Sequence, residues 1–306
     1  MSHNESQDIE LLVSAITERV RARLTGGHAE QANAAPLPAV RADGRQIHAP
    51  NCMNCELPIH ACEGCGLNPM TAPRQWMPPA SIPDAAGMAR WIDHTLLAAT
   101  ASREEIEKVC KEALKHRFFS VCVNSGNVRL AASFLQGSDV KVCAVVGFPL
   151  GAAAPGAKAF EAREAVRCGA HEIDMVINIG ALRSRDYALV TDDIRKVVLA
   201  VPGKVVKVIL ETGMLDQTQK IIACSLSKVA GAAFVKTSTG FGPGGATVED
   251  IALMRSIVGP DMGVKASGGV RTYKDAVAML QAGASRLGAS SSVRIVTNTT
   301  GSSAGY

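Results

Sequence analysis

The sequence reads VVKVILE at residues 205–211, AFVKTST at 233–239 and GVKASGG at 263–269. Each segment is a short apolar run that carries one lysine, and Lys207, Lys236 and Lys265 recur at an interval of 29 residues. A short run rich in Val and Ile and bounded by glycine is typical of a parallel strand that is buried on both faces. We therefore expect the three lysines to occupy comparable positions on three successive buried strands.

Five further runs of the same kind precede and follow these three. They are RWIDHT (90–95), FSVCVN (119–124), KVCAVVGF (141–148), EIDMVIN (172–178) and RLGAS (286–290). Amphipathic helical segments lie between the runs, and one of them opens with a capping box formed by Ser102 and Glu105. Three junctions repeat a Gly-Ala pair, at Gly169, Gly231 and Gly283, where glycine lets a helix end in a left-handed residue.

The number and order of these segments predict the fold. Eight strand–helix units within about 210 residues favour an α/β fold, a parallel (β/α)8 TIM barrel over residues 88–306. A doubly wound open sheet is the alternative. In a barrel, polar residues near the C-terminal ends of the strands gather at one mouth, so we expect the chemistry there.

The composition describes a globular chain and excludes several other classes. Of 306 residues, 47% are hydrophobic and 20% are charged, which is enough apolar material for a large core. The formal net charge of +4 is spread along the chain without a long basic run, so we do not expect nucleic acid as a partner. We find no apolar stretch that would cross a bilayer and no leader-like N-terminus. We expect a cytoplasmic protein without membrane association.

Charged residues inside the predicted buried strands are the main functional signal. Burial lowers the pKa of a lysine, and a second ammonium nearby lowers it further, so the three lysines predict a neutral amine at neutral pH. Such an amine attacks a carbonyl and forms an imine, which is the chemistry of a metal-free aldolase. Asp174 and Asp93 lie on two other strands, and Asp174 is the carboxylate we expect to shuttle protons. The alternative is that buried Lys–Asp pairs simply satisfy one another.

Glycine-rich stretches follow the last three predicted strands. STGFGPGGAT comes after Lys236, SGGV after Lys265, and GASSS forms the end of the last segment. Short side chains expose backbone N–H groups, and the loops after strands seven and eight are the common phosphate site of this barrel. The stretches predict a phosphorylated substrate, although each could also be only a tight turn.

Several motifs in this order resemble the deoxyribose-phosphate aldolase family, over about residues 88–295. They are WIDHTLL, SVCVNS, EIDMVIN, KVILETG, FVKTSTGFGPGGAT, VKASGGVRT and LGASS. The resemblance implies a carbon–carbon lyase, a class I aldolase that reversibly cleaves 2-deoxy-D-ribose 5-phosphate to glyceraldehyde 3-phosphate and acetaldehyde. It implies that Lys236 forms the Schiff base, that Lys265 perturbs its pKa and assists proton transfer, and that Asp174 donates and accepts protons. It implies no cofactor for catalysis.

The same resemblance implies a set of substrate-binding residues. Asp93, Thr95 and Cys122 match positions that order or line the pocket, and Lys207 matches a supporting charge. The phosphate would be held by Gly240, Gly268, Gly269, Gly288, Ser290 and Ser291. Some members of the family end in a mobile tail whose terminal tyrosine lies near the active site, a place that Tyr306 could take here.

The first 85 or so residues have no counterpart in such a barrel. Residues 8–24 place Ile9, Leu12, Val13, Ile16, Val20 and Leu24 at helical spacing, so we expect one amphipathic helix, followed by a flexible linker up to residue 47. The apolar stripe could pack on the main domain, pair with another copy or dock on a different protein. A helix and linker ahead of an aldehyde-producing enzyme resemble the encapsulation peptides of bacterial microcompartments. On this hypothesis the helix binds a shell protein and the enzyme lies inside the compartment.

Residues 48–87 contain four closely spaced cysteines. Cys52, Cys55, Cys62 and Cys65 form C-x2-C-x6-C-x2-C, which predicts a metal-binding segment. Four thiolates satisfy a tetrahedral zinc site, and an iron–sulfur cluster also takes four cysteines. A reduced segment without metal, or redox pairing, is the remaining alternative. The five other cysteines lie singly in apolar segments, where we expect small hydrophobes without disulfides.

Two other functions stay open at this point. One is a Schiff-base aldolase for another phosphorylated sugar. The other is a catalytically dead barrel that serves as a metal-binding or shell-cargo adaptor. The set of Lys236, Lys265 and Asp174 argues against a dead barrel, which would have no reason to keep mutually repelling buried charges. We expect the chain to form a homo-oligomer.

Overall fold

The computed structural model describes residues 9–11, 13–15, 18, 39–40, 46–47 and 77–298. The chain divides into two units, Met1–Pro73 and Arg74–Tyr306. The remaining residues of the predicted N-terminal helix, the four clustered cysteines Cys52, Cys55, Cys62 and Cys65, and Tyr306 lie outside the described residues.

The first unit shows helix and a short strand pair among its described residues. Residues 9–11, 13–15 and 18 are helical, with Ile9 and Val13 buried and Leu11 exposed. β1 (Ala39–Val40) pairs antiparallel with β2 (Gln46–Ile47), within the segment expected to be a linker. The sequence between the two strands contains Asp43-Gly44, a dipeptide that favours chain reversal.

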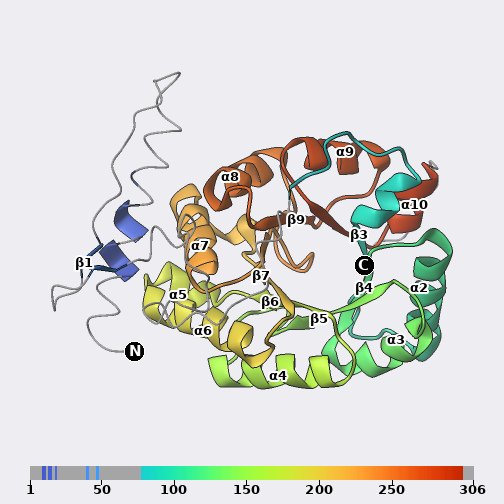
Figure 1. The fold of residues 1–306 in the computed structure, drawn as a ribbon, viewed down its shortest axis with the longest axis horizontal. Helices are drawn as coiled ribbons and strands as arrows, with labels where there is room; N and C mark the ends of the chain where they lie inside the picture. Colours follow the sequence, from blue (N-terminus) through green and yellow to red (C-terminus); the bar gives the residue numbers. More distant parts are fainter. Residues whose placement is uncertain are drawn as a thin grey trace. The chain divides into compact units, whose positions relative to one another are not determined.

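The second unit is a closed barrel of eight parallel strands, shown in Figure 1. The strands are β3 (Ile92–Leu96), β4 (Ser120–Asn124), β5 (Lys141–Val146), β6 (Glu172–Val176), β7 (Val205–Ile209), β8 (Phe234–Lys236), β9 (Gly263–Ser267) and β10 (Arg286–Ala289). They coincide with the eight predicted runs. β10 pairs with β3 and closes the sheet, which confirms the barrel and excludes the doubly wound alternative.

Helices surround the barrel (Figure 1), and all but the first and the last connect successive strands. They are η2 (Gly87–Trp91), α2 (Arg103–His116), η3 (Ser125–Asn127), α3 (Val128–Leu135), α4 (Pro155–Arg167), α5 (Ile179–Arg183), α6 (Tyr187–Ala200), η4 (Thr212–Met214), α7 (Gln217–Val229), α8 (Val248–Val258), α9 (Tyr273–Gln281) and α10 (Ser292–Thr297). The capping box of Ser102 and Glu105 opens α2 as predicted. None of the described helices combines the length and apolarity that a membrane crossing requires.

The three lysines were expected to occupy comparable positions on their strands, and the strand register shows that they do not. Lys236 lies opposite Lys265, but Lys207 lies opposite Phe234, two residues before Lys236. Equal spacing in sequence does not give equal height, because neighbouring strands of a closed barrel are staggered. Asp174 lies opposite Lys207. Lys207, Lys236 and Lys265 are all buried and all contact Asp174 from different strands, so these charges lie inside the barrel.

β8 is shorter than the predicted run at 233–239 and ends at Lys236. The Thr237 hydroxyl donates a hydrogen bond to the carbonyl oxygen of Ser267 (2.8 Å) and accepts one from its N–H (3.0 Å). A side chain thus takes part in joining β8 to β9 from this point. Lys236 is the last residue of β8, so it lies next to the loop that follows this strand.

A buried ion pair joins two helices outside the barrel. Lys158 of α4 and Asp193 of α6 approach to 2.6 Å, and Lys158 also donates to the carbonyl oxygen of Val176 (2.9 Å). Burial lowers the pKa of Lys158 and raises that of Asp193, because their attraction does not fully offset the lost hydration. This pair is a useful control for the charges inside the barrel.

Candidate active site

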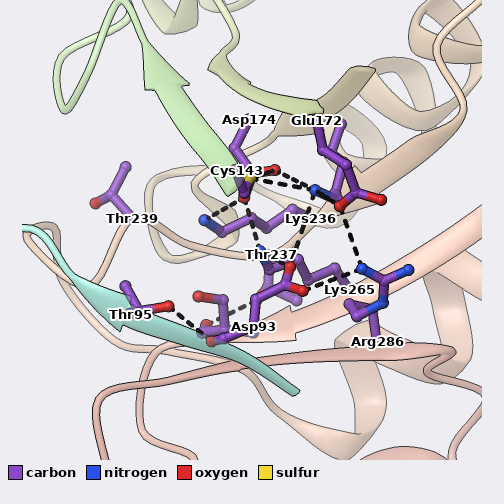
Figure 2. Close-up of polar contacts among 12 residues, drawn as sticks. Asp93, Thr95, Cys143, Glu172, Asp174, Lys236, Thr237, Thr239, Lys265 and Arg286 are labelled. Carbon is purple, nitrogen blue, oxygen red and sulfur yellow. Dashed lines mark hydrogen bonds and ion pairs between the residues drawn. The ribbon is translucent and has the colours of Figure 1, made fainter. Parts of the chain in front are cut away.

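Every strand of the barrel contributes a charged or thiol side chain to one buried cluster, most of which is labelled in Figure 2. The members are Asp93 (β3), Cys122 (β4), Cys143 (β5), Glu172 and Asp174 (β6), Lys207 (β7), Lys236 (β8), Lys265 (β9) and Arg286 (β10). The most exposed member is Glu172, at 4%. The structure therefore brings the three predicted catalytic residues into one desolvated site.

Asp174 contacts four other members of this cluster (Figure 2). Its Oδ2 accepts hydrogen bonds from Nζ of Lys236 (3.0 Å) and Nζ of Lys265 (2.8 Å). Its Oδ1 accepts from Nζ of Lys207 (2.7 Å) and Sγ of Cys143 (3.1 Å). The two lysines expected to meet at the site thus share one carboxylate oxygen.

Two of the buried lysines are held by several carboxylates. Burial by itself lowers the pKa of Lys265, but Asp174 and Asp93 attract its ammonium and raise the pKa above the ordinary value. The pKa of Lys207 is raised in the same way, and its Nζ lies 2.7 Å from both Asp174 and Glu172. The expectation that burial and mutual repulsion lower the pKa is wrong for these two lysines. The carboxylates around them outweigh both effects.

The aspartates of the cluster are ionised. Burial tends to raise the pKa of Asp174, but the ammonium groups of Lys207, Lys265 and Lys236 hold it well below its usual range. Asp93 shows the same balance, with Lys265 and Arg286 as the main cations, and its pKa is also lowered. The cluster is therefore a network of opposite charges.

This network contains more cationic side chains than carboxylates. When every group is ionised, four cations (Lys207, Lys236, Lys265 and Arg286) face three carboxylates (Asp93, Glu172 and Asp174). An excess buried charge is costly, so this arrangement favours the loss of one proton, from a lysine or from the thiol of Cys122, whose pKa is lowered by the hydrogen bond with Cys143. Within the described part of the chain, Lys236 contacts one carboxylate, whereas Lys265 contacts two.

Sequence reasoning missed three members of the cluster. Glu172 and Arg286 are the first residues of β6 and β10, and a charge inside a predicted buried strand was the available signal. Cys143 was expected to be a small hydrophobe, but its thiol donates to Asp174. No local pattern distinguishes it from the cysteines of the outer core. Its position opposite Cys122 on the neighbouring strand becomes visible only in the sheet.

The side chain of Glu211 is hydrogen-bonded to the loop that follows β8. The carboxylate of Glu211 accepts hydrogen bonds from the N–H (3.2 Å) and the hydroxyl of Thr239. The Thr239 hydroxyl in turn accepts from the N–H of Phe241 (3.0 Å). Glu211 is 2% exposed and has a left-handed φ of 57°. These contacts hold the loop that follows Lys236 in one conformation. The half-exposed ring of Phe241 packs edge-on against Phe148, with centroids 5.4 Å apart.

The other predicted substrate-binding residues lie in two places. Thr95 lies near the end of β3, and its hydroxyl donates to the carbonyl oxygen of Asp93 (2.9 Å). The residues in the segments that follow β8, β9 and β10 are Gly240, Gly268, Gly269, Ser290 and Ser291. Gly288 lies within β10 instead. A Cβ there would come within 3.0 Å of Cε of Lys265 and 2.9 Å of Oγ of Ser267. Gly288 therefore leaves the space that the Lys265 side chain occupies.

Two sets of potential metal ligands lie within the cluster. They are Cys122, Cys143 and Asp174, and Asp93, Cys143 and Glu172. The ammonium of Lys207 contacts members of both sets, at 3.4 Å from Cys143 and 2.7 Å from Asp174 and Glu172. A lysine thus supplies the positive charge that these ligands attract.

Comparison with known proteins gives one consistent result. The model of the DeoC/LacD family aldolases matches residues 88–305. A deoxyribose-phosphate aldolase of Coprothermobacter proteolyticus is 61% identical over 207 residues, which cover 68% of this chain and 94% of that protein. One from Streptococcus gordonii is 60% identical over 213 residues, with 70% and 97% covered. A tetrameric deoxyribose phosphate aldolase of Aeropyrum pernix superposes with a TM-score of 0.66 at 34% identity, covering 70% of this chain and 91% of that one.

Proposed function

Because this chain belongs to the DeoC/LacD family of aldolases, we propose that its barrel reversibly cleaves 2-deoxy-D-ribose 5-phosphate to glyceraldehyde 3-phosphate and acetaldehyde. The reaction runs through a Schiff base on Lys236. The observation that carries the proposal is the contact of Lys236 and Lys265 with the same oxygen of Asp174 inside a closed barrel.

Lys236 is the nucleophile because it has the fewest carboxylate partners in a cluster with one excess cation. Its neutral amine attacks the aldehyde carbon of the open-chain sugar. Loss of water gives a protonated imine, which withdraws electrons from the neighbouring carbon. The carbon–carbon bond beyond that carbon then breaks, leaving an enamine on Lys236 and releasing the phosphorylated aldehyde.

Asp174 and Lys265 manage the protons of these steps. The Asp174 carboxylate lies 3.0 Å from Nζ of Lys236, so it can take the proton of the hydroxyl at the breaking bond and return one to the enamine. Lys265 stays charged and keeps Asp174 ionised. Gly240, Gly268 and Gly269 lie in the loops after β8 and β9 and adopt positive φ. Glycine-rich loops at this end of the barrel support a phosphate site there, together with Ser290 and Ser291.

Borohydride trapping tests the proposal directly. Incubation with acetaldehyde and borohydride is expected to add the mass of one ethyl group to Lys236, located by peptide mass spectrometry. Absence of an adduct would support a catalytically dead barrel instead. Comparing 2-deoxyribose 5-phosphate with other phosphorylated sugars in the cleavage assay separates this activity from that of another Schiff-base aldolase.

Lys265→Leu is expected to lower kcat/KM at neutral pH about tenfold or more and to move the acidic limb of the pH profile to higher pH. Removal of this cation leaves three cations facing three carboxylates, so the Lys236 amine retains its proton more readily. Steady-state cleavage rates measured across a range of pH check this displacement. Lys228→Leu, which alters a half-buried lysine on α7 bound to the carbonyl oxygen of Val258, should leave the limb in place. A Lys265→Leu enzyme whose limb stays where it was would contradict the charge argument.

We infer further that residues 8–24 direct the enzyme to a microcompartment shell. The helical spacing of the apolar residues between Ile9 and Leu24 supports an apolar face of the kind that docks on a partner. Val13→Glu should abolish co-purification with co-expressed shell proteins, whereas Glu10→Gln should not. Unchanged co-purification after deletion of residues 8–24 would refute this role.

We also propose that Cys52, Cys55, Cys62 and Cys65 bind one structural zinc ion, on the strength of their spacing. Metal analysis of protein purified without added metal should find one zinc per chain, lost in Cys52→Ser and retained in Cys168→Ser. Iron with sulfide would indicate an iron–sulfur cluster instead. Absence of any metal would refute the site.

A homo-oligomer is the proposed assembly, since a relative from Aeropyrum pernix is a tetramer. Analytical ultracentrifugation of the full chain tests it, and a monomer at micromolar concentration would refute it.

A further inference from the structure

We propose that Arg286 and Glu172 set the protonation of the Lys236 amine from the opposite end of the barrel, as positioning residues for the Schiff-base step. The inference rests on the proposed aldolase function. Neither residue reaches the reacting atoms, so both act through the charges that lie between them and Lys236.

Arg286 is a fixed cation at the start of β10. Its Nη1 lies 3.0 Å from Oδ1 of Asp93 and 3.2 Å from Oε2 of Glu172, and its guanidinium stacks on the ring of Phe119 with the centroid 3.4 Å away. The side chain is almost wholly buried. A guanidinium does not lose its proton in a protein, so this positive charge is permanent.

Two chains of alternating charge connect Arg286 to Asp174, and the members of the first are labelled in Figure 2. The first runs through Asp93 and Lys265 to Oδ2 of Asp174. The second runs through Glu172 and Lys207 to Oδ1 of Asp174, with 2.7 Å at each contact of Lys207. The Lys236 amine contacts the oxygen at the end of the first chain. Through these contacts, a change of charge at Arg286 or Glu172 alters the electrostatic potential at the amine of Lys236.

The charge count gives the sign of the effect. Removal of Arg286 leaves three cations facing three carboxylates, which favours a protonated Lys236. Removal of the Glu172 charge leaves four cations facing two carboxylates, which favours the neutral amine. A role confined to packing would instead lower activity in both variants without opposite effects on pH dependence.

The two thiols that face this network complete the set of titratable groups. Burial raises the pKa of Cys143, which therefore stays a neutral donor to Asp174. The hydrogen bond with Cys143 lowers the pKa of Cys122. Both thiols are common to every variant compared, so a difference between pH profiles reports the substituted charge.

The test compares pH profiles of kcat/KM for cleavage in the full chain. Arg286→Met should move the acidic limb to higher pH, and kcat/KM at a fixed pH on that limb should fall about tenfold for every pH unit that the limb moves. Glu172→Gln, which keeps an oxygen acceptor for Lys207, should move the limb to lower pH. The double variant should return the limb toward that of the unmodified enzyme.

Two controls separate charge from structure. Arg286→Lys retains the positive charge, so its acidic limb should lie at the same pH as that of the unmodified enzyme, whatever its absolute rate. Asp193→Asn alters a buried carboxylate paired with Lys158 outside the barrel and should not move the limb. If Arg286→Met does not fold, the opposite displacement in Glu172→Gln and the retained limb in Arg286→Lys still decide the matter.

Limbs that do not move, or that move in the same direction, would overturn the inference while leaving the aldolase activity of the unmodified enzyme intact. An unmodified enzyme that neither cleaves the sugar nor is trapped with acetaldehyde would overturn the proposed function, and with it this inference.

Discussion

Lys236→Ala is expected to lower kcat for cleavage of 2-deoxyribose 5-phosphate on the order of 10⁵-fold, because no imine can form without the amine. Neither neighbouring lysine can replace it. Lys265 contacts Asp93 and Asp174, Lys207 contacts Asp174 and Glu172, and the pKa of each is raised by these carboxylates. Both remain ammonium groups, which have no lone pair with which to attack a carbonyl.

Three measurements on this variant decide the assignment. Steady-state assays give the loss of activity, borohydride trapping with acetaldehyde should yield no adduct, and circular dichroism should show an intact fold. Lys228→Ala, at a half-buried lysine on α7, should keep both the activity and the adduct. Retention of more than about one per cent of the activity, or an adduct on another lysine, would show that Lys236 is not the nucleophile.

Asp174→Asn is expected to lower both activity and stability. The carboxylate accepts four hydrogen bonds, and an amide would leave three buried lysine side chains without their central counter-charge. Loss of one partner of a buried ion pair typically lowers the free energy of unfolding by about 3–5 kcal/mol. Loss of the proposed proton shuttle should lower kcat by about 10²–10⁴-fold. Denaturant unfolding and steady-state assays at neutral pH measure the two effects.

The pH dependence of stability provides an independent check on the charge of Asp174. Its pKa in the folded protein lies well below the ordinary value of 3.8, so its contribution to stability is complete above that value. The contribution declines as the pH falls from about 4 toward the folded pKa. Unfolding free energies of Asp174→Asn should therefore fall less steeply in acid than those of the unmodified protein.

Asp193→Asn is the matched control for this measurement. Burial raises the pKa of Asp193, so its charge is less favourable in the folded protein than that of Asp174. This variant should keep the cleavage activity and should not flatten the loss of stability in acid. Identical acid profiles for Asp174→Asn and the unmodified protein would show that Asp174 is not a buried, ionised counter-charge.

The barrel could be predicted because its signals are local. Each strand is a short apolar run, α2 carries its own capping box, and Gly169, Gly231 and Gly283 adopt positive φ where helices end. The lysines stood out because a charge inside such a run requires a partner. The same rule applied to Glu172 and Arg286 would have identified two further members of the cluster.

The sequence by itself determined the eight strands, the proposed reactive residues and the family, since all three depend on residues close together in the chain. Only the tertiary structure decided which charges meet. Lys265 and Asp93 are 172 residues apart, and Arg286 and Asp93 are 193 apart, so only the closure of β10 on β3 brings them into contact. Those contacts reverse the effect of burial on two lysines and leave Lys236 with a single carboxylate among the residues that the structure describes. The physical reason is that electrostatic energy depends on distance in space and not on separation along the chain.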